Sequence, residues 1–352
     1  MYVKDKTSFS YVNKSHPNAI RLVQQMNHSN GIVGYVDKKK LPDKFKNKIE
    51  KAGKISINPD QPLSYYQDKE FIGNSVIIID TSELSRNSCL YIVSELQRIR
   101  NGSTWNQKFP KSEVINAEIS LPVQNGEIDF EFMDTFITEL EAERIAELSA
   151  YLKVSGLDNY ELSVEELKAL RDYDSLEWKE FNLEKLFGKS TRGKRLRSLD
   201  RISGDLPFVT AGETNTGISA YISNEVEIFK ANTVTIDMFG SAKYRNYDYG
   251  ADDHIAVVHT EKLNKFASLF TTAAIHKASY SGKFSYDKNF YAKDADELVI
   301  ALPVDCQGVI QYDYMSLIAS AIQKLVIKDV VKYTNERIET TKEVVTSHNT
   351  NY

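Results

Sequence analysis

The 352-residue sequence has few of the features that mark secreted, membrane or zinc-binding proteins. It contains two cysteines, Cys89 and Cys306, whose spacing fits neither a metal site nor a disulfide framework. No apolar run approaches the roughly 20 residues that span a bilayer, and residues 1–6 lead into no signal-peptide segment. These absences predict a protein of the reducing cytoplasm with no membrane association.

Catalytic motifs are equally scarce. The sequence has no nucleophile elbow, phosphate-binding loop, dinucleotide fingerprint or zinc signature, and its six histidines show no ligand spacing. The best metal-like cluster is Asp252-Asp253-His254, but its counterpart in the first half of the chain, residues 73–75, has no carboxylate. Asp237 and Lys243 suggest a nuclease set, yet Ser241 stands where an acidic residue is expected. These residues make no positive case for an enzyme, a catalytic residue or a bound metal.

The sequence does contain a duplication of a whole domain, offset by about 180 positions. Five segments of the first half return in order in the second: Gly31–Val36 as Gly217–Ile222, Ile55–Asn58 as Val234–Asp237, Ser75–Ile79 as His254–Val258, Trp105–Phe109 as Tyr286–Phe290, and Leu121–Val123 as Leu302–Val304. We call residues 1–128 the first head and residues 178–310 the second head. Two similar but non-identical heads suit two similar but non-identical targets.

Both heads are predicted to be α/β (α+β) domains, because short β-branched or aromatic runs alternate with turn residues. The expected strands are Ile20–Val23, Ile32–Val36, Ile55–Ile57 and Val76–Ile79, then Pro207–Thr210, Ile218–Ile222, Thr233–Asp237, Ile255–Val258 and Leu298–Leu302. Leu90–Arg100 and Phe266–Lys277 are expected to form matching helices. A chain of this length suits two domains of about 130 residues with connecting helices.

Each head is followed by a segment with helical periodicity. Residues 129–177 form a first spacer region, in which Ser163–Glu166 is a capping box; residues 311–345 form a second spacer helix, before a disordered tail, residues 346–352. The apolar seams comprise Met133, Ile137, Leu140, Ile145, Leu148 and Leu152, and Met315, Ile318, Ile322 and Leu325. Two such seams are predicted to pair as a coiled coil; the alternative is that each helix packs only on its own head.

The charge distribution is uneven. A net charge of −5 by itself argues against a nucleic-acid partner, but residues 189–201 are strongly basic while residues 139–147 and 161–184 are acidic. Local charge governs the attraction of a polyanion. The basic run therefore predicts phosphate contacts, with a solvated loop as the alternative.

Two polar loops precede the repeated glycines Gly31 and Gly217. We call residues 24–30 the first polar loop and residues 210–216 the second polar loop. They align position by position and carry different side chains, as two readers of two base sequences require. Gln and Asn pair with adenine, Arg and Lys pair with guanine, and Glu accepts from cytosine.

A second variable stretch, residues 98–105, is matched by residues 277–283 and combines basic with aromatic side chains. The structural alternative is a solvated loop, or a buried anchor for Trp105 and Tyr286. The residues expected to contact DNA are Gln24, Gln25, Asn27, His28, Asn30, Arg98, Arg100, Asn101, Trp105, Lys189, Arg192, Lys194, Arg195, Arg197, Thr210, Glu213, Thr214, Asn215, Lys277, Tyr280, Ser281 and Lys283.

Nearly the whole chain resembles the type I restriction–modification DNA specificity subunits, closest to the branch shared with type IIB specificity subunits. The segments that carry the resemblance are Trp178–Phe181, Leu186–Gly188, Gly193–Leu196, Pro207–Gly217, Ile236–Gly240, Tyr249–Asp253, Lys283–Tyr286 and Leu302–Val304. No single motif is decisive, but their order and the head–helix–head–helix layout are specific.

The resemblance implies two tandem target-recognition domains that each read one half of a split DNA sequence. It also implies that the two long helices form an antiparallel coiled coil, fix the distance between the heads and dock two DNA methyltransferase subunits. A restriction subunit is a further candidate partner. Methylation and cleavage would belong to these partners, with S-adenosylmethionine in the methyltransferase and no cofactor in this chain.

The first head departs from the family pattern. Trp178 precedes Gly217 by 39 positions, whereas 30 residues precede Gly31. The first head is therefore expected to be N-terminally shortened, without counterparts of the Trp178 segment or the basic run. The chain is truncated there, was carved from a larger restriction enzyme, or opens this head differently.

Two other functions stay open from the residues alone. One is a metal-dependent nuclease that uses Asp237, Asp252 and Asp253; the other is a two-headed protein-binding adaptor.

Overall fold

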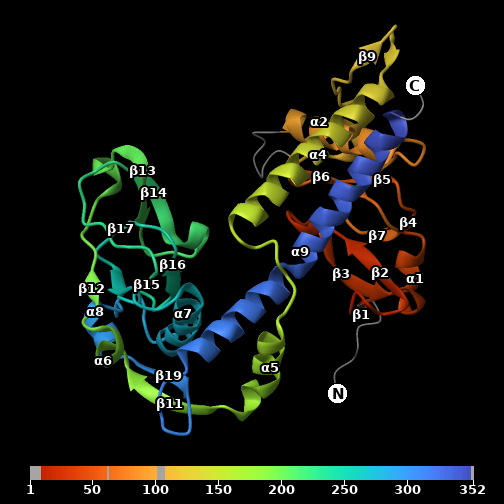
Figure 1. Cartoon of the computed structure of the whole chain (residues 1–352). Helices are drawn as coiled ribbons and strands as arrows, with labels where there is room; N and C mark the ends of the chain where they lie inside the picture. The colour runs from red at the N-terminus through yellow and green to blue at the C-terminus, as the bar shows by residue number, and fades with distance from the viewer. Residues whose placement is uncertain (1–8, 62, 101–107, 350–352) are drawn as a thin grey trace, which may run out of the picture. The chain divides into compact units, whose positions relative to one another are not determined.

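The structure is a computed structural model that describes residues 9–61, 63–100 and 108–349 (Figure 1). Its contacts divide the chain into two units, Met1–Leu148 with Arg337–Tyr352, and Ser149–Glu336. The divisions fall inside the two long helices and not at the ends of the predicted heads. Each unit is described separately below.

The first head combines two larger sheets and a two-stranded one with one substantial helix. Its elements are β1 (Tyr11–Val12), β2 (Ala19–Val23), β3 (Ile32–Asp37), α1 (Asp43–Lys46), β4 (Ile49–Glu50), β5 (Lys54–Asn58), β6 (Leu63–Gln67), β7 (Phe71–Gly73), β8 (Ile77–Asp80), α2 (Arg86–Arg100), α3 (Lys111–Asn116), β9 (Val123–Gln124) and β10 (Glu127–Ile128). The strands form a five-stranded sheet, β1-β3-β2-β7-β4, and a three-stranded sheet, β6-β5-β8. Alternate apolar residues of β5, Ile55 and Ile57, are buried with Cys89 and Leu96 of α2.

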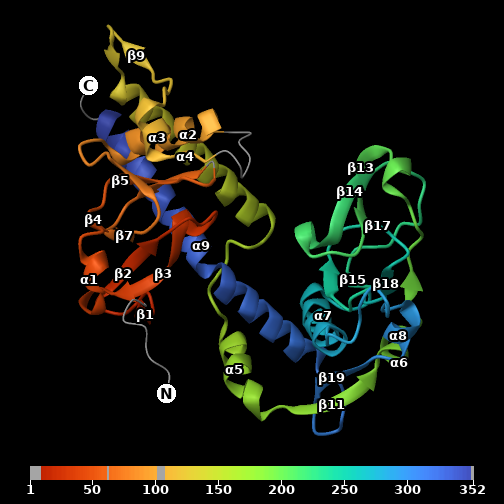
Figure 2. The same cartoon turned by 180° about the vertical axis from the view of Figure 1, so that it is seen from behind.

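The second head repeats this plan. Its elements are β11 (Glu177–Asn182), α6 (Leu183–Phe187), β12 (Thr191–Arg192), β13 (Ser203–Val209), β14 (Ile218–Ile222), β15 (Thr233–Asp237), β16 (Ala242–Arg245), β17 (Gly250–Ala251), β18 (Ile255–Val258), α7 (Lys265–Ser279), α8 (Ala292–Asp296) and β19 (Val299–Val304). The sheets are β12-β18-β15-β16, β14-β13-β17 and β11-β19. Helix α7 packs against β15 and β16 (Figure 2), and Ile275 of α7 is buried with Val234 and Ile236 of β15.

The predicted duplication is confirmed by strand order and register. β3-β2-β7 corresponds to β14-β13-β17, and in both triplets the first pairing is antiparallel and the second parallel. β6-β5-β8 corresponds to β16-β15-β18. Even the irregularity is shared, since the register shifts between Leu22 and Val23 and again between Phe208 and Val209. These pairings define which residues of the two heads are equivalent.

The heads differ at their edges, as the sequence predicts. β11 pairs along six residues with β19, whereas β9, which begins at the last residue of the equivalent Leu121–Val123 segment, pairs only with the short β10. Nothing in the described part of the first head corresponds to β12, and β1 is instead added beside β3. The first head therefore opens with different pairings from the second.

The spacer regions are helical, as predicted, and comprise α4 (Phe130–Val154), α5 (Val164–Asp172) and α9 (Tyr312–Asn349). The capping box of α5 is confirmed: Glu166 N donates to Ser163 Oγ and Ser163 N donates to the Glu166 carboxylate. α9 continues to Asn349, past Thr346, where the sequence placed the start of a disordered tail, because no glycine or proline interrupts it. None of the described helices combines the length and apolar character needed to cross a bilayer.

The predicted helix seams are partly buried. Met133, Ile137, Leu152, Met315 and Ile318 are buried, Ile145 and Leu148 are half-buried, and Leu140, Ile322 and Leu325 are 38%, 50% and 47% exposed. Met315 belongs to the core of the second head, so this position packs on its own head. Within the first unit, Arg337 of α9 forms an ion pair with Glu141 of α4 at 2.6 Å. The antiparallel coiled coil stays a prediction.

Candidate nucleic-acid interface

The two polar loops close with the same unusual backbone. Ser29, Asn30 and Gly31 have φ of 52°, 53° and 75°, and residues 215–217 have φ of 48°, 52° and 83°. Gln24 N donates to Gly31 O at 2.9 Å, and Thr210 N donates to Gly217 O at 2.8 Å. Successive left-handed residues that are not glycine persist only where the surroundings hold them. Both loops therefore have one enforced conformation.

A glycine is required at the end of each loop. A Cβ atom built on Gly217 would lie 2.7 Å from Thr210 O, and one built on Gly31 would lie 3.2 Å from Gln24 O. Because the loop folds back on the strand that precedes it, no side chain fits there without displacing the main chain.

The loops present most of their predicted side chains to solvent. Exposed in the first polar loop are Gln25, Asn27, His28 and Asn30, and exposed in the second are Glu213, Thr214 and Asn215, whereas Gln24 and Thr210 are half-buried. Gln24, Gln25 and Met26 also line a hollow with Asn74 and Ser75. The arrangement offers amide, hydroxyl and carboxylate groups from a fixed backbone, which suits hydrogen bonding to base edges.

The second polar loop is tied to a turn that follows β15. Lys243 Nζ lies 3.2 Å from the Glu213 carboxylate and 3.3 Å from that of Asp237, and it donates to Ser241 Oγ at 2.9 Å. Hydrogen bonds from Ser241 and Lys243 hold the pKa of Glu213 below its usual value. Glu213 is therefore a charged acceptor whose side chain remains 67% exposed.

The nuclease interpretation of Asp237 is wrong. Its side chain is buried, and Oδ1 accepts hydrogen bonds from Phe239 N and Ser241 N, both at 3.0 Å. At the equivalent position of the first head Asn58 Oδ1 accepts from Asp60 N at 3.0 Å. Because the neutral amide of Asn58 accepts the corresponding hydrogen bond in the first head, we infer that the Asp237 carboxylate anchors a turn.

Asp252, Asp253 and His254 do lie together, and among the described residues they form a possible ligand set that excludes Asp237. Asp252 Oδ1 accepts from Leu196 N at 3.2 Å, which fastens the basic run to the strand end. Asp253 lies 3.5 Å from Arg192 and 3.1 Å from His254. These contacts indicate that Asp252 and Asp253 anchor the basic run.

The turn after β15 also contacts the loop that follows α7. Ser279 Oγ donates to Gly240 O at 2.6 Å, and the ring of Phe239 meets that of Tyr286 edge to face at 5.2 Å. Tyr286 is 81% exposed, so the alternative of a buried anchor is wrong for this residue. Of the predicted residues here, Lys277, Ser281 and Lys283 are exposed, and Tyr280 is exposed and stacked on His276.

In the second head the polar loop, the turn at 237–241 and the loop at 280–286 thus form one connected surface. Sequence reasoning missed Phe239 as a contributor, and it considered Lys243 only as part of a nuclease set. The phenylalanine beside Gly240, inside the Ile236–Gly240 segment that carries the family resemblance, is the signal that could have identified the turn.

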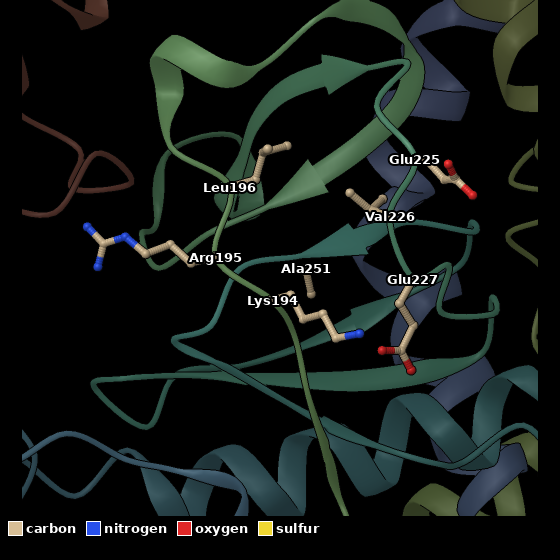
Figure 3. A pocket seen from close by; sticks show the side chains of 7 residues that line it. All are labelled: Lys194, Arg195, Leu196, Glu225, Val226, Glu227 and Ala251. Atoms are coloured by element: carbon tan, nitrogen blue, oxygen red, sulfur yellow. The ribbon is translucent and has the colours of Figure 1, made fainter.

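The basic run lies beside β17, which pairs with β13, the strand that leads into the second polar loop. Lys194 N donates to Ala251 O at 2.9 Å, and Asp252 N donates to Val209 O at 2.9 Å. Lys194, Arg195 and Leu196 line a hollow with Glu225 and Glu227 (Figure 3). The Lys194 ammonium points toward the Glu227 carboxylate, whereas the Arg195 side chain points away from the hollow.

Two of the other predicted cations of the basic run have partners within the protein, and two have no ion pair among the described residues. Arg192 donates to Asp253 O and lies over the Tyr291 ring. Arg197 pairs with Asp200 at 2.7 Å, and that hydrogen bond raises the pKa of Arg197. Lys189 and Arg195 are exposed, and neither forms an ion pair within the described residues. These two are the best placed for a phosphate.

The structure describes only part of residues 98–105, the stretch of the first head that matches residues 277–283. Arg98 is exposed and pairs with Glu95 at 2.6 Å, one turn earlier on α2, and that contact raises the pKa of Arg98. The side chain of Arg100, and Asn101 and Trp105 entirely, lie outside the described residues. Their predicted DNA contacts stay predictions.

The chain is similar to known DNA specificity domains and subunits. Residues 175–339 match the family model of the type I restriction modification DNA specificity domain. The chain is 25% identical over 268 residues, 74% of each protein, to the type II restriction enzyme BgcI specificity subunit S.BcgI of Heyndrickxia coagulans. It also resembles the solved S subunit of the type I restriction-modification system of M. genitalium, with a TM-score of 0.56 and 16% identity over 99% of this chain and 90% of that one. That structural likeness supports the fold alone.

Proposed function

We propose, from the membership of residues 175–339 in the type I restriction modification DNA specificity domain family, that the chain reads a bipartite DNA sequence with one half-site per head. The chain has the general role of a restriction–modification specificity subunit, a class of subunit that has no catalysis of its own. The observation that carries the finer proposal is the pair of polar loops, which share a backbone and differ in their exposed side chains.

The chemistry of the loops supports reading of base edges in the major groove. Asn27 and Asn215 carry amides suited to adenine, and the Glu213 carboxylate is an acceptor suited to the amino group of cytosine. Because the left-handed backbone of residues 215–217 fixes where the Asn215 side chain points, a different side chain there changes the preferred base without moving the loop.

Phosphate contacts would position the second head on the duplex. Lys189 and Arg195 are exposed cations of the basic run, and Lys194 of this run donates its main-chain N–H to Ala251 of β17, the strand that pairs with β13. Phosphate contacts add affinity for every sequence and make binding salt-dependent, because each releases condensed counterions. The net charge of −5 therefore does not oppose DNA binding by this local surface.

Partners supply the chemistry in this proposal. DNA methyltransferase subunits, two per chain, dock on the spacer helices, and S-adenosylmethionine binds in those subunits. A restriction subunit is a further partner. The exposed apolar residues of α4 and α9, such as Phe132, Phe136 and Val326, support docking of other subunits on these helices.

Selection from a randomised duplex pool, with the cognate methyltransferase present, tests the proposal. We expect a split consensus with a fixed gap. Enrichment of a single half-site would show that the first head is inactive, and no enrichment at any salt concentration would refute DNA reading and favour a protein-binding adaptor.

Two substitutions then separate base contacts from phosphate contacts. Asn215→Ala is expected to relax preference in one half-site by about 1–3 kcal/mol. Arg195→Ala should weaken binding to all sequences alike and reduce the salt slope by about one unit. The assignment of the second polar loop is wrong if the two variants behave identically.

A further inference from the structure

The strand register identifies a pair of equivalent residues beneath the polar loops. Gln67 is the last residue of β6 and lies opposite Lys54 of β5, and Arg245 is the last residue of β16 and lies opposite Thr233 of β15. The neighbouring pairs correspond as well, since β5 and β15 align with β8 and β18 in the same register. Gln67 is 0% exposed and Arg245 is 1% exposed.

In the first head Gln67 links the loop to the sheet. Its Nε2 donates to Asn30 O at 2.9 Å and to Ser56 Oγ at 2.9 Å. Asn30 is the middle residue of the left-handed run, and Ser56 is a buried hydroxyl of β5. One amide group therefore joins the strained part of the loop to the central strand.

In the second head Arg245 makes the equivalent link. Its Nε donates to Thr235 Oγ1 at 2.9 Å, and its Nη1 reaches Thr216 Oγ1 at 3.5 Å. Thr235 corresponds to Ser56 in the register, and Thr216 corresponds to Asn30 in the loop. Both links therefore join a buried hydroxyl of the central strand to the middle left-handed residue, through the main-chain carbonyl of Asn30 in the first head and the side-chain hydroxyl of Thr216 in the second.

A second side chain from the same strand supports each loop. Tyr65 OH donates to Met26 O at 3.4 Å in the first head, and Lys243 pairs with Glu213 at 3.2 Å in the second. Side chains two residues apart in a strand point to the same face. β6 and β16 thus each present two supports to their loop, one pair neutral and one pair cationic.

We propose that Gln67 and Arg245 are positioning residues that set the sequence specificity of their own head by fixing the left-handed part of the polar loop. This inference rests on the proposed function, because it assigns base reading to the loops. Base contacts require donors and acceptors placed to within a fraction of an ångström. Loss of the link allows residues 215–217 to leave the left-handed region, which ordinary side chains disfavour.

The chemical difference between the heads provides the test. Arg245 is a buried cation with hydroxyl partners, Thr235 and Tyr247, and no ion pair to a carboxylate among the described residues. The positive charge of Arg245 is therefore not needed for an ion pair. If Arg245 acts only by linking the loop to the sheet, glutamine, the residue of the first head, should replace it.

The experiment uses the full chain with its methyltransferase and compares Arg245→Met with Arg245→Gln. Tyr244→Phe is the matched control, because Tyr244 lies between the two supports, faces away from them and loses one hydrogen bond, to Asn232 at 3.0 Å. Hydrogen exchange of the 210–217 segment without DNA measures loop order. Selection from the randomised duplex pool measures discrimination at each half-site separately.

We expect Arg245→Met to speed exchange of the loop and to lower discrimination at the second half-site by about tenfold, the size of one lost base contact. Arg245→Gln should retain discrimination within about threefold, and neither variant should alter the first half-site. Gln67→Met should produce the opposite pattern. Tyr244→Phe should leave both half-sites unchanged.

The proposal is overturned if Arg245→Met leaves loop exchange and discrimination unchanged, or if it affects both half-sites equally. It is also overturned if Arg245→Gln fails as badly as Arg245→Met. Should Arg245→Met not fold, Lys243→Met, which removes the more accessible support, must loosen the same loop or the proposal fails. If the wild-type chain selects no DNA while Arg245→Met still loosens the loop, the positioning role stands and the proposed function is wrong.

Discussion

The carboxylate of Glu166 is predicted to stabilise the second unit more at neutral pH than at acid pH. It is the third residue of α5, accepts from Ser163 N at 2.8 Å and from Ser320 Oγ at 2.6 Å, and pairs with Lys324 at 2.9 Å. The side chains of Glu166 and Lys324 are 5% and 18% exposed. One carboxylate therefore caps α5 and joins it to α9.

The substitution Glu166→Gln keeps the shape and the capping acceptor and removes the charge. Removing one partner of a fully buried ion pair costs about 3–5 kcal/mol. Because the amide retains hydrogen bonds and Lys324 reaches some water, we expect a loss of about 2 kcal/mol. Glu166→Ala also removes the capping box and should cost about 1 kcal/mol more.

The pH dependence follows from the direction of the pKa shift. Burial raises the pKa of Glu166, but hydrogen bonds from Lys324, Ser320 and the main chain of Ser163 outweigh it, and the pKa lies below its usual value. A lowered folded-state pKa contributes stability above the unfolded value of about 4.3, and this contribution is lost as pH falls through the folded value.

Urea unfolding of the wild type and Glu166→Gln between pH 7 and pH 3 measures this contribution. The difference in free energy of unfolding should be largest at neutral pH and shrink on acidification. Glu165→Gln, one residue earlier and exposed, is the control and should change the free energy of unfolding far less than Glu166→Gln. A pH-independent difference, or none at pH 7, would refute the reasoning.

Three further outcomes are expected. In urea unfolding, Gly188→Ala should lower the free energy of unfolding by about 1 kcal/mol, because alanine disfavours its left-handed backbone. Gly217→Ala should lower it by at least about 1 kcal/mol more, because its Cβ would also lie 2.7 Å from a carbonyl oxygen. Equal losses would mean that the second polar loop relaxes freely. In thiol titration, the exposed Cys306 should react in the native protein, and Cys89, whose pKa burial raises, only after unfolding. Two fast thiols would contradict the burial of Cys89 between α2 and β5. Plasmid incubated with the purified chain and Mg²⁺ should remain intact; cleavage that Asp253→Ala abolishes would revive the nuclease interpretation.

Much of the fold could be predicted from the sequence, because its determinants are local. Apolar runs bounded by turn residues located β2, β3, β5, β13, β14, β15 and β18, and helical periodicity located α2, α4, α7 and α9. The capping box of Ser163 needs only four consecutive residues. The repeat indicated that both heads have the same strand topology, because similar patterns of apolar residues favour the same fold. Strands β7 and β17 were missed because they span only three and two residues, and β6 and β16 because polar or charged residues interrupt their apolar pattern.

The candidate site was only partly predictable. The sequence placed the polar loops correctly before their glycines, and the exposure of residues such as Asn27 and Asn215 agrees with a role in binding. It mistook Asp237 for a possible catalytic carboxylate, because an acidic side chain that anchors a turn and one that binds a metal look the same in sequence.

By itself, then, the sequence determined the duplication, most of the secondary structure and the positions of the two polar loops, all of which depend on neighbours along the chain. Only the tertiary structure decided that Gln67 lies beneath Asn30 and Arg245 beneath Thr216, at separations of 37 and 29 residues. Such contacts arise from strand register and from how a loop folds back over a sheet. The same register lets a neutral amide and a buried guanidinium occupy one position, an equivalence that residue type alone conceals.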